Sequence, residues 1–135
     1  HGYIVVVVTN QSGVARGYYD EAAVLRLHDW MNAQLTKHGA HIDAFYYCPH
    51  HPEAAVPAYR KPCDCRKPAP GMILRAIAAH GIDPAVSFLF GDGVRDVAAA
   101  EAAGVRGVRY TGGSLLDCVR GAVEAAEGSS READA

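Results

Sequence analysis

The sequence lacks the features that mark membrane-spanning and nucleic-acid-binding proteins. Its 13 Lys and Arg residues are balanced by 15 Asp and Glu, so the formal net charge is -2, and no basic stripe runs along the chain. This balance argues against a nucleic-acid-binding surface. The longest apolar run, residues 4–8, is far shorter than the roughly 20 residues needed to cross a bilayer. The sequence shows no signal-peptide pattern, which would combine a charged start with a small-residue cleavage site.

What remains is an ordinary globular composition over 135 residues, half of them apolar. That length suits one domain, which we expect to cover residues 1–126. Residues 127–135 are polar and small, and they predict a flexible tail. The chain starts at His1, two residues before a strand-like run, and has no Met there. This start predicts that the chain begins inside a larger protein.

Three of the four cysteines are arranged as metal ligands rather than as a disulfide framework, and the fourth, Cys118, is expected to be a small buried apolar residue. Cys48 lies two residues before His50, and after twelve further residues come Cys63 and Cys65. Three thiols and one imidazole make a closed tetrahedral zinc site, which would be structural because no position is left for water. His51 is the rival to His50 as the fourth ligand. The alternative to a zinc site is two free thiols together with a pair that lies near a histidine by coincidence. Clustered Cys and His are typical of cytoplasmic metal sites.

Apolar patterning predicts strands that alternate with helices. The run at residues 3–9 is continuously β-branched, as in a parallel strand buried on both faces. The helix expected at residues 21–38 repeats apolar residues every three or four positions, which predicts one buried face. Further strands are expected at 42–47, 86–90 and 105–110, and further helices at 72–80, 96–103 and 114–126. This order predicts an α/β fold with a doubly wound parallel sheet, interrupted by a long loop at residues 48–70.

Polar residues follow the predicted strands where a parallel sheet binds its ligands. Asp92 and Asp96 follow one strand and could hold Mg²⁺, although they could equally be a turn residue and a helix cap. Arg66 and Lys67 leave the cysteine loop and could neutralise a phosphate, or they could be solvated surface cations. Residues 9–12 offer hydroxyls, amides and turn N–H groups that could hold phosphoryl oxygens. Together these groups indicate a phosphate-plus-magnesium site.

Four segments carry a specific resemblance: VVVVTNQSGVARG, YYCPHHP, CDCRKPAPGM and GDGVRD. They resemble the haloacid-dehalogenase-like phosphatases, which have a Rossmann-like fold. Within that family, the zinc loop and its CDCRKP exit are similar to the branch that removes the 7-phosphate of a heptose bisphosphate during lipopolysaccharide synthesis. A histidinol-phosphate or other small phosphatase is the second enzyme hypothesis. A non-catalytic zinc-bearing domain that binds sugar phosphates is a third.

The resemblance implies an Asp nucleophile that forms an aspartyl-phosphate, a second Asp as acid/base, catalytic Mg²⁺ and structural Zn²⁺. It also implies a small phosphorylated sugar as the partner and a monomeric protein that binds neither nucleic acid nor membrane. Thr9 would hydrogen-bond the transferring phosphoryl group, and Lys67 would balance its charge. The residues implied in substrate binding are Thr9, Asn10, Gln11, Ser12, Arg66 and Lys67. Asp92 would bind magnesium with support from Asp96, and Cys48, His50, Cys63 and Cys65 would bind zinc.

The chain departs from the family pattern in two places. The motif Asp-x-Asp-Gly-Thr, which carries both the nucleophile and the acid/base, does not occur in these 135 residues. In the family its strand lies centrally, between the strands expected here at 3–9 and 86–90. We therefore expect a gap between those two strands, and a chain that is inactive by itself. Gly93 also stands where the family usually has Lys, which removes one cation.

Overall fold

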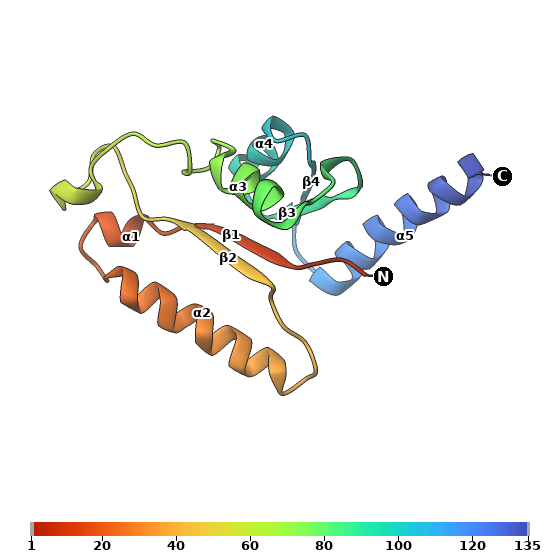
Figure 1. The fold of residues 1–135 in the computed structure, drawn as a ribbon, viewed down its shortest axis with the longest axis horizontal. Coiled ribbons are helices and arrows are strands. Elements are labelled where there is room, and N and C mark those ends of the chain that lie inside the picture. The colour runs from red at the N-terminus through yellow and green to blue at the C-terminus, as the bar shows by residue number, and fades with distance from the viewer. Residues whose placement is uncertain (1, 135) are drawn as a thin grey trace.

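The computed structural model describes the backbone of residues 2–134 and the side-chain surroundings of residues 2–129 (Figure 1). The predicted alternation of strands and helices is confirmed. A short helix, α1, and two 3₁₀ turns, η1 and η2, are additional. In chain order the elements are β1 (Val6–Asn10), α1 (Ser12–Ala15), α2 (Glu21–Thr36), β2 (Ala44–Cys48), η1 (Pro57–Tyr59), α3 (Gly71–His80), η2 (Pro84–Val86), β3 (Phe88–Gly91), α4 (Val94–Ala102), β4 (Arg106–Arg109) and α5 (Leu115–Asp134).

The helices begin and end where local chemistry requires it. The Asp20 carboxylate accepts a hydrogen bond from the Ala23 N–H at 2.9 Å and thereby caps α2. Gly81 ends α3 in the left-handed conformation, with φ 60°, which a residue with a side chain rarely adopts. The helix end predicted at residue 126 is wrong, because α5 continues through Ala- and Glu-containing sequence to Asp134. Residue 135 of the predicted tail lies outside the described part of the chain.

The described strands form two separate parallel pairs. β1 pairs with β2, Val6 lying opposite Ala44, and β3 pairs with β4, Phe88 lying opposite Arg106. Within residues 2–134, no ladder joins β1 to β3, so each of these strands has one edge without a strand partner. This break lies between the two strands that the sequence predicted to flank a missing central strand.

Helix α3 connects the two halves. Its Ile73 packs with Ala99 and Ala100 of α4, and Val8 of β1 and Leu89 of β3 border that cluster. Its Met72 packs against Cys48 and Cys65 in a second cluster. Both clusters involve Val8, so one turn of α3 covers the place where the two sheets face each other.

Much apolar surface that the patterning predicted to be buried is exposed. Helix α2 lies along β1 and β2 in Figure 1, and it buries Val24 and His28. On the same helix, Leu27 is 46% exposed and Trp30 is 59% exposed, so only part of the predicted apolar face is covered. A two-stranded sheet is too narrow to cover all of that face. Cys118, expected to be buried, is half-exposed. None of the described helices is both long and apolar enough to cross a membrane.

Candidate metal and phosphate site

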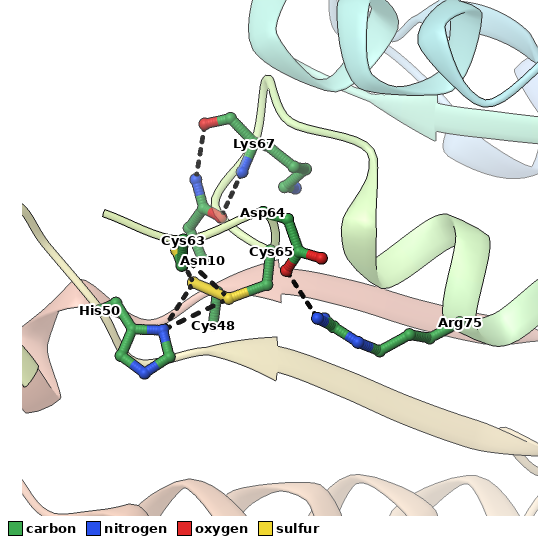
Figure 2. The surroundings of a disulfide bond; sticks show 8 residues. All are labelled: Asn10, Cys48, His50, Cys63, Asp64, Cys65, Lys67 and Arg75. Carbon is green, nitrogen blue, oxygen red and sulfur yellow. Dashed lines mark hydrogen bonds and ion pairs between the residues drawn. A yellow bond between two sulfur atoms is a disulfide. The ribbon is translucent and has the colours of Figure 1, made fainter. Parts of the chain in front are cut away.

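The loop after β2 brings the four predicted zinc ligands together (Figure 2). The three sulfur atoms and one ring nitrogen of Cys48, His50, Cys63 and Cys65 all lie within 4.8 Å of one another. The Cys63 Sγ atom lies 3.4 Å from the Sγ atoms of both other cysteines. The His50 Nδ1 atom lies 3.4 Å from the Cys65 Sγ and 3.8 Å from the Cys48 Sγ.

Two of these sulfurs are joined in the structure, because Cys48 and Cys65 form a disulfide bond. The sequence predicted four separate ligands, so in this respect the prediction differs from the structure. The donor set nevertheless fits a zinc ion. Zinc–sulfur bonds of about 2.3 Å hold tetrahedral sulfurs about 3.8 Å apart, which is close to the spacing of Cys63 from the other two. Reduction of the disulfide would leave three thiols and one imidazole around a common centre.

His50, and not its neighbour His51, faces the cysteines. Burial, followed by the positive charge of Lys61, lowers the pKa of His50 and favours the neutral imidazole that metals bind. The His51 Nδ1 atom instead accepts a hydrogen bond from the Glu53 N–H at 3.0 Å. The structure therefore favours His50 over His51 as the fourth ligand, a choice that the sequence left open because the two histidines are adjacent.

A carboxylate on α2 ties the loop to the rest of the protein. The Tyr47 and Tyr59 hydroxyls each donate a hydrogen bond of 2.7 Å to Glu21. The bond from Tyr59, followed by the bond from Tyr47, lowers the pKa of Glu21. The bond to Glu21 and burial together raise the pKa of Tyr47 to about 12. These contacts hold β2, η1 and the start of α2 together beside His50. Sequence reasoning missed them because the three residues are far apart in the chain.

Polar groups at the end of β1 are clamped to the exit of the cysteine loop. The Asn10 side chain accepts a hydrogen bond from the Lys67 N–H at 2.9 Å and donates one to the Lys67 carbonyl at 3.2 Å (Figure 2). Gln11 donates to the Thr9 hydroxyl at 3.1 Å and accepts from the Tyr19 hydroxyl at 2.6 Å. The Asn10 amide therefore fixes the loop exit to the first strand, and the Gln11 amide links the end of that strand to the segment between α1 and α2.

Lys67 reaches from that clamp into the break between the sheets. Its Nζ atom donates to the Val8 carbonyl of β1 at 3.2 Å and to the Asp96 Oδ1 at 2.5 Å. Both charged side chains are largely buried, Lys67 being 14% exposed and Asp96 13% exposed. Asp96 also accepts the Gly93 N–H at 3.0 Å. Burial by itself raises the pKa of Asp96, but the bonds from Lys67 and Gly93 outweigh it and lower that pKa.

The other predicted residues are Asp92, Ser12 and Arg66. Asp92 is exposed at the end of β3, and its carbonyl accepts from the Arg109 Nε at 3.3 Å. Ser12 begins α1, whose following residues are buried. Arg66 is half-buried, and its Nε atom is buried with no hydrogen-bond partner among the described residues. Asp92 and Asp96 together offer two carboxylates, so a magnesium ion there requires further oxygen ligands.

Comparison with known proteins points to one family. The HAD-hydrolase-like family model matches residues 64–127. The chain is similar to D-glycero-beta-D-manno-heptose-1,7-bisphosphate 7-phosphatases. It is 52% identical to that of Photorhabdus laumondii over 99 residues, 73% of this chain and 53% of the relative. It is 50% identical to that of Rhodopseudomonas palustris over 111 residues, 82% of this chain and 62% of the relative. The chain thus spans about half to three-fifths of the length of these relatives.

Solved structures agree with the sequence relatives. The D,D-heptose 1,7-bisphosphate phosphatase of B. bronchiseptica, complexed with magnesium and phosphate, matches with a TM-score of 0.68 and 39% identity, over 77% of this chain and 54% of that one. A HAD-like phosphatase from Mesorhizobium loti matches with a TM-score of 0.77 and 34% identity, over 83% of this chain and 54% of that one. On the fold, the site and these likenesses, the chain is similar to the haloacid-dehalogenase-like phosphatases over about half of their length.

Proposed function

We propose that the intact protein hydrolyses the 7-phosphate of D-glycero-D-manno-heptose 1,7-bisphosphate through an aspartyl-phosphate. The observation that carries this proposal is the position of Lys67. Its ammonium lies beside β1 and Asp96, at the carboxyl ends of β1 and β3, where a phosphoryl group would need a positive charge. The choice of substrate is supported by a sequence identity of 50–52% to relatives that are named as phosphatases of this heptose bisphosphate.

The roles of the chain's own residues follow from their contacts. The Thr9 hydroxyl, oriented by Gln11, donates a hydrogen bond to a phosphoryl oxygen, and Lys67 offsets negative charge on the phosphoryl group. Asn10, Gln11, Ser12 and Arg66 line the substrate, and the Arg66 Nε atom provides an unused donor. Magnesium, held at Asp92 with Asp96 nearby, would polarise the phosphoryl oxygens. Asp96 at the same time holds Lys67 in place.

The nucleophile belongs, in this proposal, to a segment that is not among these 135 residues. That segment would carry the Asp-x-Asp-Gly-Thr motif on a strand between β1 and β3. The unpaired strand edges at that place support this position. The direction of the backbone groups of β1 also supports this position, because successive residues of a parallel strand face opposite edges. The Val5 carbonyl accepts from the Asp43 N–H beside β2, so the backbone groups of Val6 and Val8 face the opposite edge. In this chain the Val8 carbonyl at that edge accepts from the Lys67 Nζ atom. Without the segment, the chain has no attacking carboxylate and is inactive.

Zinc has a structural role in this proposal. Bound by Cys48, His50, Cys63 and Cys65, it would order the loop that delivers Arg66 and Lys67 to the phosphate. A cytoplasmic location would keep the three cysteines reduced and available to the metal. The protein would act as a monomer on a small phosphorylated sugar.

The test compares this chain with a version extended at its amino end by a segment that carries the motif. We expect magnesium-dependent phosphate release from the heptose bisphosphate only with the extended protein. Replacing the motif's first Asp by Asn is the matched control and should abolish release. Release from the 135-residue chain alone would refute the proposal. A preference of the extended protein for histidinol phosphate would instead favour the second enzyme hypothesis.

In the extended protein, Lys67→Ala should lower kcat more than it raises KM, because the ammonium matters most as charge redistributes in the transition state. Arg66→Ala should act mainly on KM. A kcat within about twofold of the original, roughly 0.4 kcal/mol, would show that Lys67 contributes little to catalysis.

A further inference from the structure

A hollow lies at the carboxyl ends of β3 and β4, and Asp92 is part of its wall. It is open to solvent, has a volume of about 380 Å³ and is lined by Asp92, Arg109, Tyr110, Thr111 and Gly112, of which only Tyr110 is half-buried. None of these residues except Asp92 has a role in the mechanism proposed above. Their chemistry combines a guanidinium, a hydroxyl and the backbone of a glycine-containing turn.

Arg109 is held in the wall of this hollow. Its Nε atom donates to the Asp92 carbonyl at 3.3 Å. Arginine has five N–H donors, so this bond leaves the terminal nitrogens available. No other hydrogen bond from the Arg109 side chain is found among the described residues. A guanidinium fixed through Nε presents its two terminal nitrogens as a fork, which matches the oxygens of a phosphate group.

The rest of the wall is also tied down. The Tyr110 N–H donates to the Gly91 carbonyl at 2.7 Å, and its hydroxyl donates to the Gly113 carbonyl. Gly112 and Gly113 have φ values of 118° and 79°, so this turn requires residues without a side chain. The turn therefore holds the backbone of Thr111 and Gly112 in the wall of the hollow that Arg109 also lines.

A continuous chain of contacts links this hollow to Lys67. Lys67 bonds to Asp96, Asp96 accepts the Gly93 N–H, and the preceding residue, Asp92, bonds through its carbonyl to Arg109. The two cations therefore lie on either side of one short turn. A ligand with two phosphate groups on one sugar could meet Lys67 with one phosphate and Arg109 with the other.

We propose that the hollow at Arg109 binds the second phosphate of a sugar bisphosphate, the one that is not hydrolysed. This subsite rests on the proposed function, since it assumes that the reacting phosphate lies at Lys67. The Asp92 carboxylate also lines the hollow and opposes an anion by its charge. With magnesium on Asp92, as proposed above, that opposition is removed.

The chain offers a matched control on the same strand. Arg106 lies at the other end of β4, and its guanidinium is 5.7 Å from the centre of the Phe88 ring. Arg106→Gln and Arg109→Gln remove the same charge from one strand, but only Arg109 is beside Asp92. A loss caused merely by net charge or by weakening of β4 would appear in both variants.

The first experiment titrates this chain, reduced and with zinc and a fixed excess of magnesium, with glucose 1,6-bisphosphate and separately with glucose 6-phosphate. Binding is followed by amide NMR shifts. We expect the bisphosphate to bind about tenfold more tightly, as one charge-assisted contact predicts. Arg109→Gln should remove this preference, and Arg106→Gln should retain it. Equal affinities in the original chain, or a preference that survives Arg109→Gln, would overturn the subsite.

The second experiment separates the subsite from the function. In the extended protein, Arg109→Gln should raise KM for the heptose bisphosphate about tenfold and leave the KM for a monophosphorylated sugar unchanged. Hydrolysis with no change in either KM would overturn the subsite and leave the function standing. No hydrolysis at all, with an Arg109-dependent preference still seen in the titration, would overturn the function and leave the subsite standing.

Discussion

The ion pair between Lys67 and Asp96 should couple the two halves of the protein, and a double-mutant cycle can measure that coupling. Lys67→Met removes the charge but keeps most of the apolar length. Asp96→Asn keeps the shape and an oxygen for the Gly93 N–H. Stability is measured as the free energy of unfolding in urea, with the protein reduced and zinc in excess.

The magnitude follows from the contacts that each change removes. Lys67→Met leaves Asp96 with one hydrogen bond and the Val8 carbonyl without its donor. A hydrogen bond to a charged group contributes about 1.5–3 kcal/mol, and breaking a fully buried ion pair costs about 3–5 kcal/mol. Since both side chains are largely but not fully buried, we expect Lys67→Met to destabilise by about 2–4 kcal/mol.

Asp96→Asn should cost somewhat less, about 1.5–3 kcal/mol, because the amide keeps one of the two bonds. The double variant should be more stable than the sum of the two losses predicts, by a coupling energy of about 1–2 kcal/mol. A coupling energy below about 0.5 kcal/mol would refute the reasoning, because that is the scatter expected for independent sites. Lys67 and Asp96 would then be neighbours that contribute separately.

Three further predictions concern the titration of Asp96, the zinc ligands and two glycines. The pKa of Asp96 is lowered in the folded protein, so its stabilisation is complete above the unfolded pKa near 3.9 and disappears as pH falls through the folded value. The difference in unfolding free energy between the original chain and Asp96→Asn should therefore shrink below about pH 4, and a constant difference would contradict this. Metal analysis of protein purified under reducing conditions without chelator should give about one zinc per chain. Cys63→Ser should lower that content and open the loop to protease, and Cys118→Ser, outside the cluster, should do neither. Gly71→Ala should destabilise the loop exit, because its Cβ would lie 2.3 Å from the Asp64 carbonyl oxygen. Gly121→Ala, with open space around it in a helix, should instead stabilise by about 0.5–1 kcal/mol, and equal effects of the two changes would show that the contact is not limiting.

The sequence by itself determined the features that depend on neighbours along the chain. The β-branched run before Asn10 predicted a parallel strand, and the helices predicted at 21–38 and 72–80 correspond to α2 and α3. These signals act within a few residues, so no knowledge of distant contacts is needed. The spacing of Cys48, His50, Cys63 and Cys65 predicted their cluster for the same reason, because each pair of ligands lies on one short turn. The absent motif also predicted the break between β1 and β3.

Only the tertiary structure decided which distant side chains meet. Glu21, Tyr47 and Tyr59 come from three elements, and no local pattern indicates that one carboxylate accepts both hydroxyls. The apolar periodicity of α2 also predicted more burial than the structure shows. Periodicity shows which face of a helix is apolar, but not whether a sheet is wide enough to cover that face. The hollow at Arg109 exists because β3 and β4 lie in register and bring Asp92 beside Arg109, seventeen positions later. Such contacts depend on how the strands pair, and strand pairing is settled only when the whole sheet forms.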